Sequence, residues 1–255
     1  MIIQVENPIV EIHNLTVGYQ GKPVLWNVDC SFPEKKLIGI IGPNGSGKST
    51  LLKSIMGLVA PSSGYVKLFG AELSQVRSQI SYVPQRETVD WDFPASVLDV
   101  VLMGRYNPKN MFKRTSKEDL SIAQEALQKV NLMDFAKRQI SQLSGGQQQR
   151  VFIARALAQQ AELYIMDEPF AGVDAATEEA ILQILMDLKN QGKTVVMVHH
   201  DLQTASDFFD WVVLLSNRLV ASAPTDQVLI PALLQEAYGG KLTILSRMGN
   251  VLKQK

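Results

Sequence analysis

The stretch that decides the fold is Gly42-Pro43-Asn44-Gly45-Ser46-Gly47-Lys48-Ser49-Thr50. Four residues separate its first glycine from Gly-Lys-Ser, which is the spacing of a phosphate-binding loop. Glycines let such a backbone bend tightly and bring its N–H groups close to an anion. The ammonium of Lys48 can reach β- and γ-phosphates, and the Ser49 hydroxyl can ligate Mg²⁺. The stretch therefore predicts a phosphate site.

The residues on either side of this stretch fit that interpretation. Residues 36–41 form a short apolar run, which is typical of a buried parallel strand. Leu51, Ile55 and Leu58 recur at helical spacing, so a bound phosphate would lie at a helix N-terminus. The alternative is a glycine-rich turn that binds nothing, and the strand before and helix after argue against it.

Composition describes an ordinary globular chain. It has 255 residues, 46% of them hydrophobic and 20% charged, which suits one large domain or two small ones. Because 25 basic residues balance 25 acidic ones, we expect no nucleic-acid partner. Cys30 is the single cysteine, so no internal disulfide forms and a reducing compartment is indicated. Its expected place is the core.

The sequence gives no sign of a membrane-spanning segment. The N-terminus lacks a basic region followed by a long apolar stretch, so we expect no signal peptide. Nowhere do about eighteen apolar residues run together, so no spanning helix is expected. A role at a membrane would be that of a peripheral subunit, in a chain that is soluble by itself.

Strand and helix patterns alternate along the chain. Residues 9–32 predict two short strands around a turn at 18–23, with Tyr19 at the tip, where its ring could stack on a base or simply face solvent. Residues 95–140 change to helical periodicity, which indicates a helical insertion. This alternation around one phosphate loop predicts an α/β fold with a mostly parallel sheet covered by helices.

A second anion site is indicated at Leu143-Ser144-Gly145-Gly146-Gln147. Ser144 is a good N-cap for the helix that follows. The two glycines leave backbone N–H groups bare at the positive end of that helix. A plain capped helix is the alternative.

Two acidic residues, Asp167 and Glu168, lie at the end of a predicted strand over residues 163–169. Because adjacent strand residues point in opposite directions, we expect the two carboxylates to do different jobs. One can hold the water shell of Mg²⁺ while the other faces a γ-phosphate as a base. The alternative is a charged strand end. His199 and His200 would diverge for the same reason and make a poor metal chelate.

With these motifs in this order, together with Gln85, residues 9–240 resemble the ATPase subunit of ATP-binding-cassette (ABC) transporters. The resemblance implies a P-loop NTPase fold of the ABC type: a mostly parallel sheet core, an N-terminal antiparallel β-subdomain and an inserted α-helical subdomain. It implies one domain over 1–255, with the core at about 1–94 and 160–240, the helical subdomain at about 95–159, and a short tail at 241–255.

The resemblance also implies ATP and Mg²⁺ as cofactors. Tyr19 matches the aromatic residue that stacks on adenine, and the stretch from Gly42 to Thr50 matches the phosphate loop, with Lys48 as its catalytic cation. Ser49, Gln85 and Asp167 match the residues that hold Mg²⁺ and its water shell.

The remaining roles follow from the same resemblance. Glu168 matches the general base, and His200 the histidine that contacts the γ-phosphate; the Asp-Leu that follows favours it over His199. Asp174 ends the loop 171–174 that joins two half-sites. The segment Ser144-Gly145-Gly146-Gln147 matches the contact to ATP held by the opposite subunit, with Ser144 and Gly146 as donors. A working dimer that sandwiches two ATP molecules is thereby implied.

A narrower resemblance, in residues 84–106, is to the manganese/zinc/iron-type metal importers. It implies ATP-driven uptake of a divalent transition metal, manganese first and then zinc or iron, at the cytoplasmic face of the cell (inner) membrane. The partners implied are a second copy of the chain, two polytopic permease subunits and, indirectly, an external metal-binding protein.

Within this region, the segment after Gln85 would face the membrane subunits. Trp91 and Phe93 would suit such an interface, or would pack the helical insertion. A non-transport ABC ATPase that acts on a soluble assembly, and an exporter subunit, are the alternative functions.

Overall fold

The computed structural model describes residues 1–106 and 115–239, which form two compact units. The first unit contains residues 1–76 and 198–239, and the second contains 77–106 and 115–197. The predicted tail at 241–255 and most of the basic segment between Arg105 and Lys117 lie outside the described residues. The domain boundaries expected from sequence stay a prediction.

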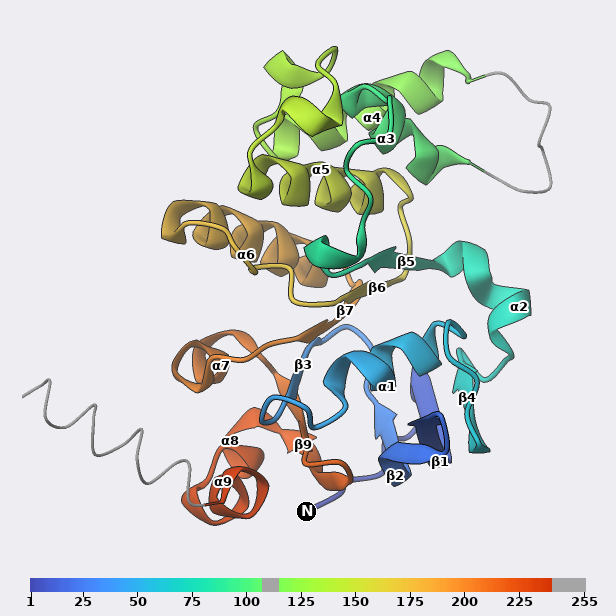
Figure 1. Ribbon diagram of the computed structural model, residues 1–255, viewed down its shortest axis with the longest axis vertical. Coiled ribbons are helices and arrows are strands. Elements are labelled where there is room, and N and C mark those ends of the chain that lie inside the picture. The colour runs from blue at the N-terminus through green and yellow to red at the C-terminus, as the bar shows by residue number, and fades with distance from the viewer. Residues whose placement is uncertain (107–114, 240–255) are drawn as a thin grey trace, which may run out of the picture. The chain divides into compact units, whose positions relative to one another are not determined.

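The first unit contains an antiparallel sheet of three strands in the order β2-β1-β4 (Figure 1). Its strands are β1 (Val10–Tyr19), β2 (Lys22–Phe32) and β4 (Ser63–Leu68). Buried and more accessible residues alternate over much of β1, so one face of the strand supplies apolar side chains to the core. The predicted hairpin and the N-terminal antiparallel subdomain are confirmed.

The same unit carries the strand that leads into the phosphate loop. This is β3 (Leu37–Ile41), which pairs in parallel with β8 (Trp211–Leu215), and β8 pairs antiparallel with β9 (Leu219–Pro224). Every residue of β3 and β8 is buried, as expected for strands covered on both faces. The helices of this unit are α1 (Lys48–Ile55), α2 (Leu73–Val76), α7 (Leu202–Phe208), α8 (Thr225–Val228) and α9 (Pro231–Tyr238).

The second unit has three parallel strands in the order β5-β6-β7. They are β5 (Ile80–Val83), β6 (Leu163–Met166) and β7 (Thr194–Val198). The helices are α3 (Val97–Leu102), α4 (Lys117–Lys129), α5 (Gly145–Ala158) and α6 (Ala175–Asn190). Among the 3₁₀ turns, η1 (Arg77–Gln79) and η2 (Arg86–Thr88) flank β5.

Helices α3, α4 and α5 pack on one another, and Figure 1 shows them gathered beyond β5 and β6. Ser96 and Ser116 cap α3 and α4, each with an aspartate three residues later completing a capping box. The fold class expected from sequence, α/β with mostly parallel strands and an antiparallel β-subdomain, is confirmed. Across residues 1–106 and 115–239, no helix combines the length and the apolar character that crossing a membrane requires.

Candidate nucleotide site

The side chain of Lys48 bonds to the backbone of the phosphate loop. β3 ends at Ile41 and α1 begins at Lys48, so the loop joins a buried strand to a helix N-terminus, as predicted. The Nζ atom of Lys48 donates to the carbonyl oxygens of Gly42 at 2.8 Å and Pro43 at 3.1 Å, and the side chain is buried. The ammonium is thereby held inside the loop, where a phosphate group can compete with these carbonyls for it.

Two positions in this loop accept only glycine. A Cβ at Gly42 would lie 2.1 Å from the Leu215 carbonyl oxygen. Gly47 has φ of 95°, and a Cβ there would lie 2.4 Å from Cδ2 of Leu25. The loop therefore packs directly against β2 and β8.

Ser46 leaves a hydrogen-bonding group unused at the loop. Its Oγ atom is shielded from solvent and has no hydrogen-bond partner in the described part of the chain. Burying a hydroxyl without a partner is unfavourable, so such a group indicates a partner that arrives from outside. The residues of the loop thus fit an anionic ligand.

Asn217, in the turn between β8 and β9, holds the phosphate loop from outside. Its Nδ2 atom donates to the carbonyls of Val24 at 3.1 Å and Gly45 at 3.3 Å, and its backbone N–H donates to Ser46 at 3.1 Å. The residue has φ of 59°, a conformation that asparagine tolerates better than most residues. Sequence reasoning missed Asn217, because nothing local signals a contact 172 residues away.

The two adjacent histidines lie in different environments. His199 is buried, and its Nε2 atom lies 2.8 Å from Oγ1 of Thr204. Burial, and secondarily His200, lowers the pKa of His199 to about 4. His199 is therefore a neutral core residue, whereas His200 is exposed and available to a ligand. The role of His200 as the contact to the γ-phosphate stays a prediction. Tyr19 is 46% exposed at the end of β1, so its ring is open to stacking.

In the second unit, the structure brings Gln85 and Glu168 together. The Nε2 atom of Gln85 donates to Oε2 of Glu168 at 3.4 Å. Asp167 is fully buried, and its N–H donates to the Val83 carbonyl at 2.9 Å. Asp167 is buried and Glu168 is half-buried, and the different roles expected for them stay a prediction; the argument from strand alternation was wrong. β6 ends at Met166, and Glu168 turns away because its φ is 50°.

Ser144 caps α5, as predicted. Its N–H donates to Oε1 of Gln147 at 2.9 Å, and the Gln147 N–H donates to Ser144 Oγ at 3.4 Å, which makes a capping box. Since this Oγ acts there as an acceptor, its own proton stays available for a further bond. A Cβ at Gly146 would meet Val173 only at 3.7 Å, so no described neighbour requires glycine there.

Asp174 is an N-cap as well as a candidate contact between half-sites. Its Oδ1 accepts from the Thr177 N–H at 2.9 Å and so begins α6. Hydrogen bonds from Thr177 lower the pKa of Asp174. Sequence reasoning missed this cap, although an aspartate directly before a helical run is the signal that could have found it.

Trp91 belongs partly to the packing of the second unit. Its ring meets the ring of Phe152 edge-on at 5.0 Å between centroids, and its Nε1 donates to the Arg86 carbonyl at 3.0 Å. Of the two alternatives for this residue, the structure thus supports packing against the helical insertion. Phe93 is half-buried.

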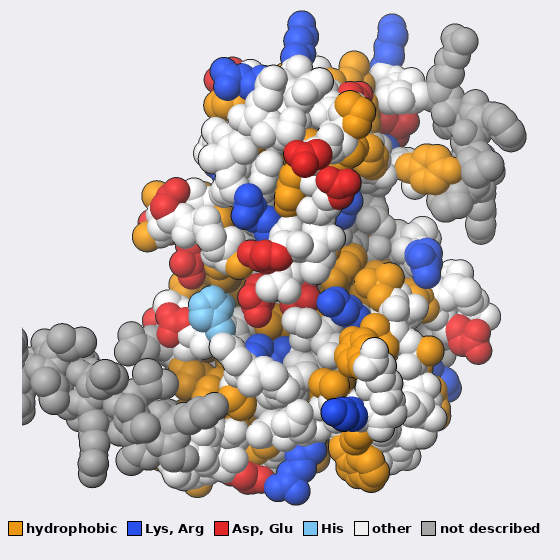
Figure 2. All heavy atoms as spheres, viewed as in Figure 1, with side chains coloured by type: hydrophobic (Ala, Val, Ile, Leu, Met, Phe, Trp, Pro, Cys, Tyr) orange, Lys and Arg blue, Asp and Glu red, His pale blue; other side chains and the backbone are white. Residues whose placement is uncertain are grey.

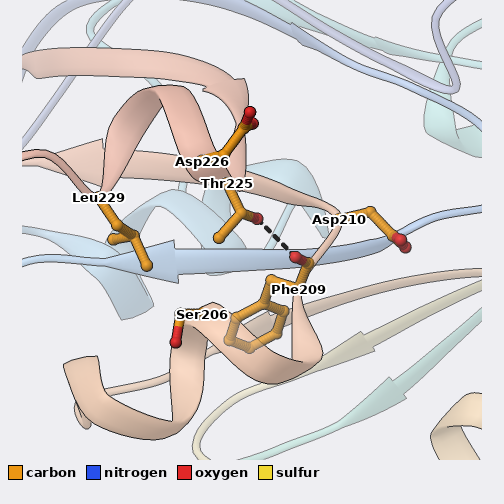
Figure 3. Close-up of a pocket in the computed structure, with 6 residues that line it drawn as sticks. All are labelled: Ser206, Phe209, Asp210, Thr225, Asp226 and Leu229. Atoms are coloured by element: carbon orange, nitrogen blue, oxygen red, sulfur yellow. Dashed lines mark hydrogen bonds between the residues drawn. The ribbon is translucent and has the colours of Figure 1, made fainter.

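A separate hollow of about 420 Å³ lies in the first unit and is drawn in Figure 3. Its Thr225 hydroxyl donates to the Phe209 carbonyl at 2.6 Å, and Asp210 accepts from the Leu37 N–H at 2.9 Å. These polar groups therefore bond within the protein, and the Asp210 and Asp226 side chains point apart in Figure 3. This arrangement does not indicate a ligand.

Charges do not gather by sign on the face drawn in Figure 2, where basic and acidic side chains are interspersed.

Within residues 1–106 and 115–239, no group of three His, Cys, Asp or Glu side chains is placed to hold a metal ion.

Comparison with known proteins reveals clear relatives. A sequence model described as "ABC transporter" matches residues 25–171. The chain is 60% identical to the manganese transport system ATP-binding protein MntB of Bacillus subtilis (strain 168), over 92% of this chain and 94% of that protein. It is 53% identical to the zinc transport system ATP-binding protein TroB of Treponema pallidum (strain Nichols), over 92% of this chain and 88% of that protein.

Solved structures agree with these relatives. One is a dimeric ATP-binding cassette in a post-hydrolysis state, bound to ADP and Pi: the TM-score is 0.74 at 33% identity, covering 85% of this chain and 98% of that chain. Another is the ADP conformation of an ATP-binding cassette of an ABC transporter. Its TM-score is 0.77 at 26% identity, and the match covers 91% of this chain and 99% of that chain.

Proposed function

Because this chain belongs to the ABC transporter family as its ATP-hydrolysing subunit, we propose that it powers the import of a divalent transition metal, manganese first and then zinc or iron. The manganese and zinc transport relatives support this order of substrates. The observation that carries the ATPase part is the pair of Gln85 and Glu168, which places an amide donor against the candidate base.

ATP binding is assigned to the loop from Gly42 to Thr50. Its backbone N–H groups and Lys48 receive the phosphates, the unused Ser46 hydroxyl gains a partner, and Tyr19 stacks on the adenine. Ser49, Gln85 and Asp167 supply the oxygen ligands and water contacts that Mg²⁺ prefers. When bound there, Mg²⁺ would supply positive charge beside the phosphates of ATP.

Hydrolysis is assigned to Glu168 and His200. The Glu168 carboxylate accepts a proton from the attacking water, and Gln85 holds that carboxylate in orientation through its Nε2 atom. His200 contacts the γ-phosphate. Phosphoryl transfer needs positioning and charge stabilisation rather than covalent chemistry, and this set of groups supplies both.

A second copy of the chain completes the site. Glycine within a helix is about 1 kcal/mol less favourable than alanine. No described neighbour of Gly146 demands glycine, so its bare backbone leaves room for another molecule to approach closely. We assign that approach to ATP bound by the second copy, with the Ser144 proton and the Gly146 N–H as donors.

The transported metal stays off this chain, which moves two membrane permease subunits at the cytoplasmic face. An external metal-binding protein delivers the metal. Dimerisation is weak and depends on ATP, so a tight nucleotide-free dimer in light scattering would contradict the proposal.

The test uses Glu168→Gln with MgATP as bait in detergent-solubilised native membranes. A polytopic membrane protein should be recovered, and the reconstituted pair should take up Mn²⁺ with ATP, more strongly than Zn²⁺ or Fe²⁺. Recovery of soluble or ribosomal proteins alone would overturn the transport role and favour an ABC ATPase that acts on a soluble assembly.

A further inference from the structure

Arg86 connects the segment after Gln85 to the first turn of α5, and we propose that it is a positioning residue for ATP hydrolysis. It holds the segment Ser144–Gln147 in register with Gln85 and Glu168. This inference rests on the proposed function, because the roles of those residues are taken from it.

The guanidinium of Arg86 contacts the start of α5 at two places. Its Nη2 atom donates to Oε1 of Gln148 at 3.1 Å. It also covers Gly145, where an added Cβ would lie 2.9 Å from the Arg86 Cζ. Gln148 is buried, with an exposed fraction of 5%. Its Nε2 atom donates to the Ile140 carbonyl at 3.2 Å. Both ends of this amide are therefore engaged, so Gln148 gives Arg86 a fixed point of attachment.

A second attachment lies one helical turn further along α5. The Trp91 indole N–H donates to the Arg86 carbonyl at 3.0 Å, and its ring packs on Phe152. Gln148 and Phe152 are four residues apart, so they share one face of the helix. The segment from Arg86 to Trp91 is thus joined to two successive turns of α5 and moves with it.

In the chain, Arg86 directly follows the residue that bonds to the candidate catalytic base. The preceding residue, Gln85, bonds to Glu168. A continuous series of contacts therefore runs from Glu168 through Gln85 and Arg86 to Gln148 on α5. A shift of the segment after Gln85 must alter the geometry at one end of the series or the other.

The way Arg86 is buried favours positioning over simple stabilisation. Its Nε atom is shielded from solvent and makes no hydrogen bond within the described residues. A polar group buried without a partner is unfavourable, so an apolar side chain would fill this place with fewer unsatisfied groups. An apolar side chain would lose the directional bond to Gln148 and the cation–π contact of the guanidinium with the Trp91 ring, whose centroid lies 5.9 Å away.

The experiment compares Arg86→Met, Arg86→Lys and wild type in the full chain. It measures the Kd of a fluorescent ATP analogue, kcat and KM for ATP hydrolysis, and the thermal unfolding midpoint. Arg86→Met should lower kcat roughly tenfold or more and leave the Kd within about twofold, since no group of the phosphate loop is changed. Arg86→Lys keeps a donor and should recover part of kcat. Arg138→Met is the matched control, because Arg138 is an exposed arginine of the same unit that lies over Phe135.

A double-mutant cycle with Gln148→Leu identifies the contact. If Arg86 acts through Gln148, the double variant should be no slower than the slower single variant. Additive losses, an unchanged kcat in Arg86→Met, or a Kd weakened in parallel with kcat would each overturn the inference. The test uses MgATP and needs neither the transported metal nor a membrane subunit. If metal uptake failed but Arg86→Met still slowed hydrolysis, the proposed substrate would be refuted and this inference would stand.

Discussion

The amide nitrogen of Gln85 lies 3.4 Å from the carboxylate Oε2 of Glu168, with Gln85 as the donor. Glu168→Gln keeps the length of the side chain and an acceptor oxygen for that bond, and removes the basic oxygen. We expect ATP binding within about twofold of wild type and hydrolysis slower by roughly 10²–10⁴-fold, the usual contribution of a positioned general base. Single-turnover assays measure the rate, and undiminished turnover would contradict the role.

The clamp made by Asn217 on the phosphate loop gives the second prediction. Asn217→Gly keeps the positive φ and removes the bonds from Nδ2 to Val24 and Gly45. Each such bond contributes about 0.5–1.5 kcal/mol, so we expect ATP affinity to fall by roughly 5–10-fold through a looser loop. Titration calorimetry measures the Kd.

Asn27→Gly is the matched control for that change. Asn27 also has positive φ, 47°, in the same unit, and it is exposed. Equal losses of affinity in both variants would show a general effect of glycine on the β-subdomain, and would remove the specific role of Asn217.

Local signals explain why the phosphate loop, Ser144 as a cap and the strands around them could be predicted from the sequence. Spacing of a few residues encodes each one, as in Gly42 to Thr50 and in the buried run of β3. The contacts of Asn217 and Arg86 could not be predicted, because they join residues 172 and 62 positions apart and depend on how the strands pack.

The turn at Glu168 shows a further limit. Sequence reasoning extended the strand pattern through both carboxylates, whereas β6 stops one residue before Asp167. Positive φ at a glutamate has no local sequence signature, because glycine and asparagine are the residues that favour it. Strand alternation therefore does not determine how the two carboxylates lie.

The lowered pKa of His199 predicts stability that falls in acid. Its folded pKa is about 4, below the ordinary value of 6.5, so the unfolded chain binds the proton more readily between these values. The free energy of unfolding should therefore decrease as pH falls through this window, by about 1–2 kcal/mol between pH 6.5 and pH 5. Urea unfolding at several pH values measures the slope.

His199→Gln isolates this contribution. Glutamine can still bond to Thr204 and does not titrate, so the variant should show a shallower pH dependence between pH 6.5 and pH 5. An unchanged slope in His199→Gln would mean that other groups cause the acid sensitivity.

Alanine substitutions at Gly146 and Gly145 distinguish a glycine that a ligand requires from a glycine that the fold requires. At Gly146 a methyl group meets Val173 at 3.7 Å, an ordinary contact, so Gly146→Ala should unfold at the same or slightly higher temperature, by up to about 1 kcal/mol of helix propensity. Its hydrolysis and ATP-dependent dimerisation should nevertheless fall by roughly tenfold or more, because the methyl group blocks ATP of the second copy.

Gly145→Ala should behave in the opposite way in the stability assay. Its methyl group would lie 2.9 Å from the Arg86 guanidinium, so Arg86 must move away from Gln148 and the unfolding temperature should drop. If Gly146→Ala lost stability as Gly145→Ala does, Gly146 would serve this chain's own packing. If it kept full activity and dimerised with ATP, Gly146 would have no role. In either case the second copy would have to contact ATP through other groups.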